Sequence, residues 1–197
     1  MSSNFLEQLN ENQRKAVIET SGPLLILAGA GTGKTKVLTT RLANILKNKL
    51  ASPYETLTVT FTNKAASEMK DRVEGMLKVG TAGWWIGTFH SMAARILRMH
   101  PELVGLKKQF SIIDTDDQIR LVKQALSYHN VDEKKWPARL IHATIQRWKD
   151  KGLNPGEAPE NNSTGEINVT KIYKTYQERL ITLNVVDYGD LLLQNIN

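Results

Sequence analysis

The stretch from Leu24 to Thr35, LLILAGAGTGKT, constrains the fold of this chain more than any other. Its first part, Leu24–Leu27, is an apolar run without polar alternation, which predicts a strand buried on both faces of a parallel sheet. A turn of small residues follows, and apolar residues then recur at helical spacing from about Lys34 to Lys47. A strand, a glycine-rich turn and a helix in this order are typical of a phosphate-binding loop, or P-loop.

The turn supplies the groups that bind phosphate. Its glycines at positions 29, 31 and 33 allow positive φ, so that successive N–H groups point into one concave nest. Lys34 adds a positive charge, Thr35 offers a hydroxyl to a magnesium ion, and the helix directs its positive dipole end at the same phosphates. We therefore predict Lys34 and Thr35 as catalytic residues and Thr35 as a metal ligand. The predicted nucleotide-binding residues of the loop are Ala28, Gly29, Ala30, Gly31, Thr32, Gly33, Lys34 and Thr35.

One position departs from the strict motif, because Ala28 stands where the first glycine is expected. Alanine is a small replacement that the loop accommodates. The alternative interpretation is a glycine-rich turn that merely joins a strand to a helix. The strand, the turn, the Gly-Lys-Thr triplet and the helix all occur in the required order, which favours the P-loop.

The composition is that of a globular protein with an excess of basic residues. Of the 197 residues, 41% are apolar and 23% are charged, which suffices for a packed core. The sequence contains no cysteine, so disulfides and thiolate metal sites are excluded. The net charge of +6 favours a polyanionic partner such as nucleic acid, although the basic residues are spread along the chain. No apolar run approaches the roughly 18 residues of a membrane span, so we expect a cytoplasmic protein without a membrane partner.

Two further units repeat the order of strand, turn and helix. Thr56–Phe61 and Gly83–Thr88 are predicted strands, and each is followed by helix-capping residue types and a helical pattern. Parallel strands present the turns at their carboxyl ends to ligands. The turn from Phe61 to Lys64 could therefore stack a base and hold a phosphate, or could be an ordinary capped helix with Phe61 in the core. His90, in the next turn, is expected to be a neutral hydrogen-bonding group at the same edge.

A glutamine precedes the P-loop by about fifteen residues. Gln13 opens a short helical pattern, NQRKAVIET. Its planar amide donates and accepts at once, which is the geometry needed to read the edge of an adenine. A lone glutamine is usually only a solvated side chain, so this assignment depends on the P-loop that follows.

The C-terminal half changes character. Phe110–Asp114 is a predicted strand, and Thr115 with Gln118 is interpreted as a capping box that opens a helix through Leu126. Beyond it, residues 116–150 and 169–195 are predicted to be helices without strands, separated by a Gly- and Pro-rich loop over residues 151–165. This pattern predicts an α/β domain over residues 1–115 and a helical subdomain over residues 116–197.

A P-loop enzyme also needs an acidic residue at the end of an apolar strand to hold magnesium. No strand here ends in Asp-Glu. The nearest candidates are Asp114 and Asp187, each of which follows an apolar pair. Both are better explained as carboxylates at helix ends.

Four motifs in one order, Gln13, AGAGTGKT, TFTNKAASEM and GTFHSMAARIL, resemble the first four motifs of the superfamily 1 DNA helicases of the UvrD, Rep and PcrA type. FSIIDTDDQIRLVKQAL and YQERLITLNVVDYGDLL are similar to the helical insertion of that family. The resemblance implies two tandem RecA-like α/β domains, each with a helical insertion, with ATP between them and single-stranded DNA across their tops. For this chain it implies a RecA-like P-loop NTPase fold, in which helices flank a parallel sheet and an all-helical subdomain is inserted.

The resemblance also implies a function. The chain would be the N-terminal part of an ATP- and Mg²⁺-dependent helicase that moves 3′ to 5′ on single-stranded or 3′-tailed duplex DNA, in repair or replication restart. Gln13 would read adenine. The family pattern places this chain ahead of the Asp-Glu strand and without the second RecA-like domain, so we expect it to bind nucleotide and DNA without turnover. The residues expected to contact DNA are Phe61, Thr62, Asn63, Lys64, Thr88 and His90.

Two alternatives remain open from the sequence. One is a stand-alone P-loop module that binds nucleotide without hydrolysing it, which the lack of a magnesium carboxylate supports. The other is the helicase part of a helicase-nuclease, because such proteins share these motifs.

Overall fold

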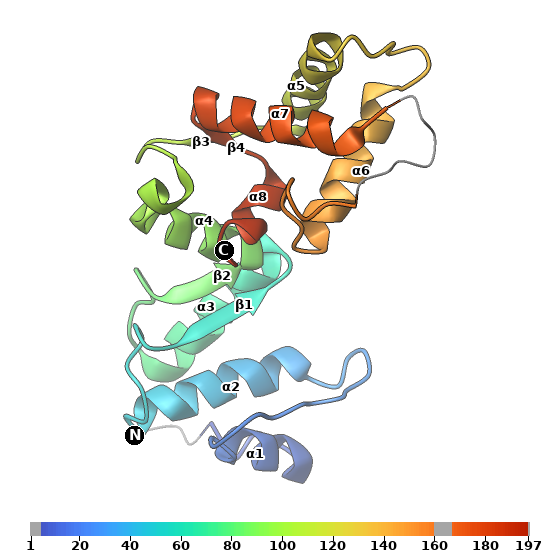
Figure 1. Ribbon diagram of the computed structural model, residues 1–197. Helices are drawn as coiled ribbons and strands as arrows, with labels where there is room; N and C mark the ends of the chain where they lie inside the picture. The colour runs from blue at the N-terminus through green and yellow to red at the C-terminus, as the bar shows by residue number, and fades with distance from the viewer. Residues whose placement is uncertain (1–4, 160–166, 197) are drawn as a thin grey trace. The chain divides into compact units, whose positions relative to one another are not determined.

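The structure is a computed structural model that describes residues 5–159 and 167–196. Its internal contacts divide the chain into two compact units, Met1–Met92 and Ala93–Asn197, and helix α4 (Phe89–Met99) runs through the division. The elements are labelled in Figure 1. The boundary expected after residue 115 concerns the inserted subdomain of the family and stays a prediction.

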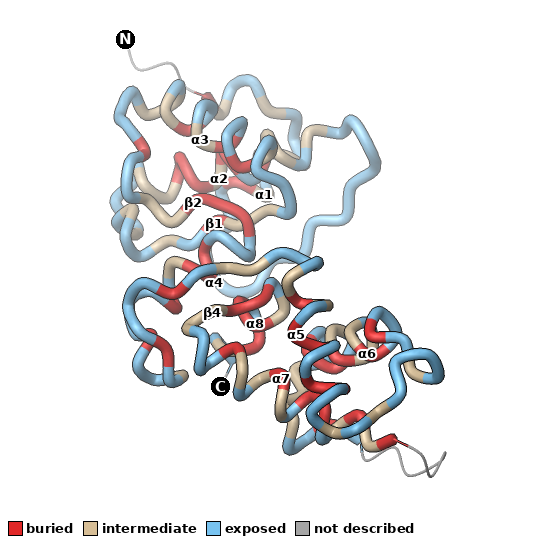
Figure 2. Tube along the Cα trace, turned by 90° about the horizontal axis from the view of Figure 1, so that it is seen from above, coloured by how far each residue is buried: buried red, intermediate tan, exposed pale blue. Residues whose placement is uncertain are grey.

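The first unit is built around a parallel pair of strands. β1 (Leu57–Thr60) and β2 (Trp85–Thr88) pair in register, with Leu57 opposite Trp85 and Thr60 opposite Thr88. The helix α3 (Asn63–Leu77) connects them, and α1 (Glu11–Ile18) and α2 (Lys34–Lys47) precede them in the chain. The two strand–turn–helix units predicted from Thr56 and from Gly83 are thus confirmed, with shorter strands than expected. Buried residues on α2, α3 and β2 pack into one core: Leu42, Met69, Val73 and Ile86. Figure 2 shows buried stretches in red on these elements.

The prediction of a strand at Leu24–Leu27 is wrong for this structure. These residues form no regular element and lie in the connection between α1 and α2 (Figure 1). Their side chains are largely in solvent, with Leu25 80% and Leu27 87% exposed. A buried parallel strand requires a neighbour on each side. Among the described residues, β1 and β2 pair only with each other, so this run has no strand to join.

The second unit is mostly helical, with a core between α5 (Thr115–Tyr128), α6 (Ala138–Asp150) and α7 (Val169–Leu183). A 3₁₀ turn (Pro101–Val104) and a short helix, α8 (Tyr188–Leu193), complete its helices. The prediction of helices without strands is wrong at one point, because β4 (Val185–Val186) pairs in parallel with β3 (Ser111–Ile112). The predicted loop after Lys151 is irregular as far as residue 159, and its residues 160–165 lie outside the described part.

The cap of α5 also differs from the prediction by one residue. The side chain of Asp114 accepts a hydrogen bond from the backbone N–H of Asp117 at 2.9 Å, so Asp114 is the N-cap and Thr115 is the first helical residue. Aspartate is as good a cap as threonine, and the one-residue shift leaves the helix unchanged.

None of the helices in the described ranges is both long and apolar enough to cross a bilayer.

Candidate functional site

The P-loop joins the exposed Leu24–Leu27 segment to α2. Gly31 and Gly33 have positive φ, 74° and 87°, and Gly33 is the N-cap residue of α2. Gly29 does not lie in the left-handed region, so the expectation of positive φ is wrong for that glycine. No side chain in the described part of the chain caps α2. The N-terminal N–H groups of α2 are therefore available to an anion.

Lys34 lies folded over this loop. Its Nζ donates hydrogen bonds to the carbonyl oxygens of Ala28, at 2.9 Å, and Gly29, at 2.6 Å. Thr32 Oγ1 donates to the same Gly29 carbonyl at 2.7 Å. These contacts place the ammonium group beside the uncapped start of α2. The positive charge, the left-handed glycines and the helix N-terminus together fit a phosphate group.

Thr35 and Ala30 complete the set of loop residues predicted to bind nucleotide. Thr35 lies in the first turn of α2 and is partly exposed, and its backbone carbonyl accepts a bond from Thr39 Oγ1 at 2.9 Å. Ala30 is an exposed turn residue between the two flanking glycines. The Thr35 hydroxyl could take part in holding a magnesium ion, since oxygen ligands suit that ion.

Gln13 lies on α1 and contacts the P-loop, although 19 positions separate it from its partner Thr32 in the chain. Gln13 Nε2 donates to the carbonyl oxygen of Thr32 at 3.0 Å. Its Oε1 accepts from the backbone N–H of Asn10 at 3.1 Å, and Asn10 Oδ1 accepts from the Gln13 N–H at 2.9 Å, which completes a capping box for α1. A Cβ on Gly33 would lie 2.9 Å from Gln13 Nε2. Position 33 therefore needs glycine for its φ and also for this approach.

The residues predicted to contact DNA lie at the carboxyl ends of β1 and β2. Phe61, which follows β1, is 88% exposed, so the alternative in which it belongs to the core is excluded. Thr62 Oγ1 accepts from the N–H of Ala65 at 3.2 Å and caps α3 as predicted. Asn63 and Lys64 are exposed in the first turn of α3. These side chains form one accessible group of an aromatic ring, an amide and an ammonium.

Thr88 and His90, at the end of β2 and the start of α4, have different environments. Thr88 is 8% exposed, and its hydroxyl accepts from the N–H of Ser91 at 3.2 Å while Ser91 Oγ donates to the Thr88 carbonyl at 2.9 Å. His90 is exposed in the first turn of α4. The hydrogen bonds between Thr88 and Ser91 thus stabilise the first turn of α4. The contact of Thr88 with DNA stays a prediction.

Gly87 allows α4 to start this close to β2. A Cβ at this position would lie 2.5 Å from Met92 Cε and 2.6 Å from Ser91 Oγ. We expect Gly87→Ala to lower the free energy of unfolding by about 1 to 3 kcal/mol, because the added methyl overpacks this corner. Chemical denaturation measures this change. Gly75→Ala, in α3 with nothing within 4 Å of its added Cβ, is the matched control and should be neutral or stabilising. An equal effect of both changes would contradict the packing argument.

Phe89 is a residue that the sequence reasoning missed. It is the first residue of α4, and its ring centroid lies 5.3 Å from that of Phe61, with the planes inclined at 44°. The sequence contains a signal for it, because each strand ends in a threonine that a phenylalanine follows, as Thr60-Phe61 and Thr88-Phe89. The signal is meaningful only once the register that sets Thr60 opposite Thr88 is known.

Both candidate magnesium carboxylates act at helix ends, as predicted. Asp114 caps α5, and Asp187 caps α8 by accepting from the N–H of Asp190 at 2.8 Å. Asp187 is also buried against the ammonium of Lys149, at 2.8 Å. Within residues 5–159 and 167–196, no three His, Cys, Asp or Glu side chains are grouped so as to hold a metal ion.

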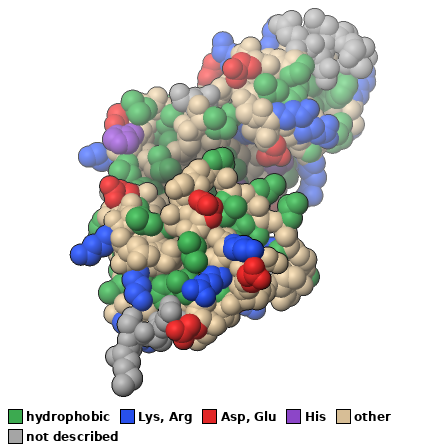
Figure 3. Space-filling model, turned by 90° about the horizontal axis from the view of Figure 1, so that it is seen from below, with side chains coloured by type: hydrophobic (Ala, Val, Ile, Leu, Met, Phe, Trp, Pro, Cys, Tyr) green, Lys and Arg blue, Asp and Glu red, His purple; other side chains and the backbone are tan. Residues whose placement is uncertain are grey.

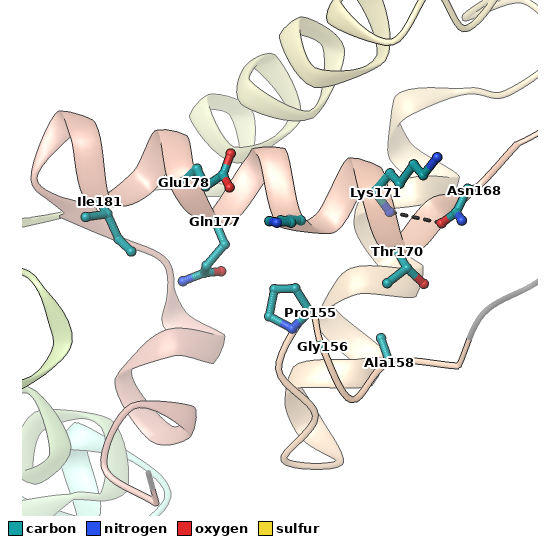
Figure 4. A pocket seen from close by; sticks show the side chains of 10 residues that line it. Pro155, Gly156, Ala158, Asn168, Thr170, Lys171, Gln177, Glu178 and Ile181 are labelled. Carbon is teal, nitrogen blue, oxygen red and sulfur yellow. Dashed lines mark hydrogen bonds between the residues drawn. The ribbon is translucent and has the colours of Figure 1, made fainter.

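Over the described residues, surface charge and pockets point to no further site besides the P-loop and the residues predicted to contact DNA. In the view of Figure 3, the basic side chains are interspersed with acidic and apolar ones. A pocket of about 510 Å³ in the second unit is lined by residues of α7, among them Thr170 and Gln177, and by Pro155, Gly156 and Ala158 of the loop before it (Figure 4). None of the predicted site residues lines this pocket.

Comparison with known proteins gives consistent matches over nearly the whole chain. The profile of the family described as UvrD/REP helicase N-terminal domain matches residues 9–197. The chain is 51% identical to a "Probable DNA helicase II homolog" of Rickettsia felis, over 98% of this chain and 30% of that protein. It is 42% identical to "DNA helicase II" of Escherichia coli, over 98% of this chain and 27% of that protein. It is also 42% identical to "ATP-dependent DNA helicase PcrA" of Bacillus subtilis, over 100% of this chain and 27% of that protein. The chain therefore spans less than a third of the length of these relatives.

Proposed function

Because the chain belongs to the UvrD/REP helicase N-terminal domain family, we propose that it is the nucleotide-binding and DNA-binding N-terminal part of an ATP-dependent DNA helicase. For the longer protein we propose movement 3′ to 5′ on single-stranded or 3′-tailed duplex DNA, in repair or replication restart. A second RecA-like domain outside this chain would complete the site.

We also propose that the first unit is part of a RecA-like sheet. The parallel pairing of β1 with β2 supports this, because strands joined through a connecting helix in this way belong to a parallel sheet.

The observation that carries the nucleotide assignment is the position of Lys34 at the uncapped start of α2. Lys34 would exchange its bonds to the Ala28 and Gly29 carbonyls for the β and γ phosphates of ATP, and the loop N–H groups would hold the same phosphates. Thr35 would contribute its hydroxyl to a magnesium ion, and Gln13, which already contacts the loop, would read adenine. In the longer protein, hydrolysis of the bound ATP would supply the free energy for movement along DNA.

The DNA assignment is supported by the carboxyl edge of the strand pair. Phe61 is 88% exposed, and Asn63, Lys64 and His90 are exposed on the first turns of α3 and α4, the helices that follow β1 and β2. Base stacking on an aromatic side chain is tolerant of sequence, and a nearby ammonium attracts the phosphates. This combination suits a motor that moves along any sequence.

We expect the 197-residue chain to bind ATP without hydrolysing it. Asp114 and Asp187 are engaged as helix caps, so neither is available as the carboxylate that phosphoryl transfer requires. The test is ATP hydrolysis with and without oligo-dT, beside a Lys34→Ala variant that reveals contaminating ATPases. Turnover above that variant would place a working magnesium carboxylate within these residues and would contradict this part of the proposal.

A further inference from the structure

We propose that Phe61 and Phe89 form a single base-stacking platform, in which Phe61 takes an unpaired nucleobase on its open face and Phe89 holds the Phe61 ring in place. The inference rests on the proposed binding of single-stranded DNA and adds a positioning residue to that site.

The register of the strand pair creates the platform. β1 and β2 are parallel neighbours with Thr60 opposite Thr88, and a phenylalanine follows each of these threonines. The chain therefore leaves both strands at one edge with an aromatic ring in the same place. The ring centroids lie 5.3 Å apart, within the range in which aromatic side chains attract each other.

The two rings have unequal roles because they are unequally accessible. Phe61 is 88% exposed and Phe89 is 42% exposed, so Phe61 has an open face and Phe89 is partly covered. The 44° between the ring planes prevents one flat base from lying parallel to both rings. The platform therefore takes one base on Phe61 and does not clamp a base between the two phenylalanines.

Phe89 is the better anchored of the two rings. It is the first residue of α4, and the exchanged hydrogen bonds between Thr88 and Ser91 fix the backbone on either side of it. Phe61 lies in the short bend between β1 and α3. A side chain on a bend loses rotational freedom when a base stacks on it, and this loss weakens binding. Contact with the anchored Phe89 ring restricts Phe61 before the base binds, so less freedom is lost on binding.

The charges around the platform suit a polyanion. The first turn of α3 carries Lys64, and the first turns of α3 and α4 contain no Asp or Glu. A nucleobase on Phe61 would therefore bring its phosphates toward two helix starts that hold an ammonium group and no carboxylate.

The test is a binding titration of the 197-residue chain with oligo-dT and with an abasic oligonucleotide of the same length, which keeps the phosphates and lacks the bases. Phe61→Ala is expected to weaken oligo-dT binding by about 5- to 150-fold. Phe89→Ala is expected to weaken it severalfold, Phe89→Tyr to preserve it, and the double variant to bind no more weakly than Phe61→Ala. Binding of the abasic strand should not change in any variant. Tyr54→Ala removes an aromatic ring that is 69% exposed and lies before β1, and serves as the control.

Two results would overturn the platform while leaving the proposed function intact: wild-type affinity of Phe89→Ala for oligo-dT, or losses in the two single variants that multiply in the double variant. Failure of the unaltered chain to bind either oligonucleotide would instead contradict the proposed function itself. Thermal unfolding of each variant, matched to the unaltered chain, shows that a loss of affinity is not a loss of fold.

Discussion

Replacement of Lys149 by methionine is expected to lower the free energy of unfolding by about 3 to 5 kcal/mol. Lys149 Nζ lies 2.8 Å from Asp187 Oδ2 and 2.7 Å from Asp190 Oδ1, and all three side chains are buried. Methionine fills much of the same volume, so the expected loss comes from the two carboxylates that remain in the interior without a positive partner. Urea denaturation followed by circular dichroism measures the difference.

The network around this lysine joins three helices. The carboxylate of Asp187 accepts hydrogen bonds from Tyr176 on α7, at 2.8 Å, and from Gln146 on α6, at 3.0 Å. Gln177 Nε2 on α7 donates to Asp190 Oδ2 at 2.9 Å. Loss of the ammonium would therefore disturb α6, α7 and α8 together, since each contributes a side chain to the network.

The two carboxylates respond to pH in opposite senses. Burial opposes ionisation of Asp187. The Lys149 ammonium, together with the hydrogen bonds that the Asp187 carboxylate accepts, outweighs burial and holds the pKa of Asp187 below the usual value. Burial, together with repulsion by Asp187, raises the pKa of Asp190. The stabilisation from ionised Asp187 is present above the unfolded pKa of about 3.9 and is lost as pH falls through the lower folded pKa. The contribution of Asp190 is present below the unfolded pKa and is lost as pH rises through the higher folded pKa.

The pH profile distinguishes charge loss from a packing defect. Without Lys149 the carboxylates take up protons more readily, so the penalty of Lys149→Met should shrink as pH falls toward 4. Lys151→Met, at an exposed position just beyond α6, is the control and should change stability by less than about 0.5 kcal/mol. Adding Asp187→Asn and Asp190→Asn to Lys149→Met should recover part of the loss. A Lys149→Met chain as stable as the unaltered one would contradict the account.

Replacement of Lys34 by alanine is expected to weaken ATP binding by about 10- to 100-fold. The ammonium would make hydrogen bonds to charged phosphate oxygens, each worth about 1.5 to 3 kcal/mol, or roughly one to two factors of ten. Isothermal titration with ATP and magnesium measures the affinity. Because the Lys34 side chain is exposed, the free energy of unfolding should change little.

The matched control for Lys34 is Lys47→Ala, which removes the same charge from the other end of α2. It should leave ATP affinity unchanged, because the helix dipole and the loop N–H groups lie at the start of α2. Equal losses in the two variants would mean that net charge, and not the loop, governs binding.

The sequence predicted those features that depend on neighbouring residues. The bounds of α2, Lys34–Lys47, follow from the glycine turn and the helical spacing of apolar residues, and the structure confirms them. Thr62 was expected as a capping residue, and it caps α3. Caps and helical periodicity act over a few residues, so a single chain contains the information that sets them.

Apart from the one-residue shift of the α5 cap and the φ of Gly29, the features that were missed depend on residues far apart in the chain. Leu24–Leu27 has the composition of a buried strand, but only neighbouring strands can make it one. β4 is too short to show a period, and it exists because Val185 and Val186 lie beside β3, more than seventy residues earlier. The sequence left open whether Phe61 is accessible or lies in the core, and its contact with Phe89 could not be inferred, because that contact depends on the register of β1 and β2.

The most direct test of the central claim, that residues 28–35 bind the phosphates of a nucleotide, is a titration of the chain with ATP and with AMP in magnesium buffer. The account predicts that ATP binds at least about tenfold more tightly than AMP, since Lys34 and the start of α2 would contact the β and γ phosphates. It also predicts that this preference disappears in Lys34→Ala. Equal affinities for ATP and AMP, or a preference for ATP that survives Lys34→Ala, would contradict it.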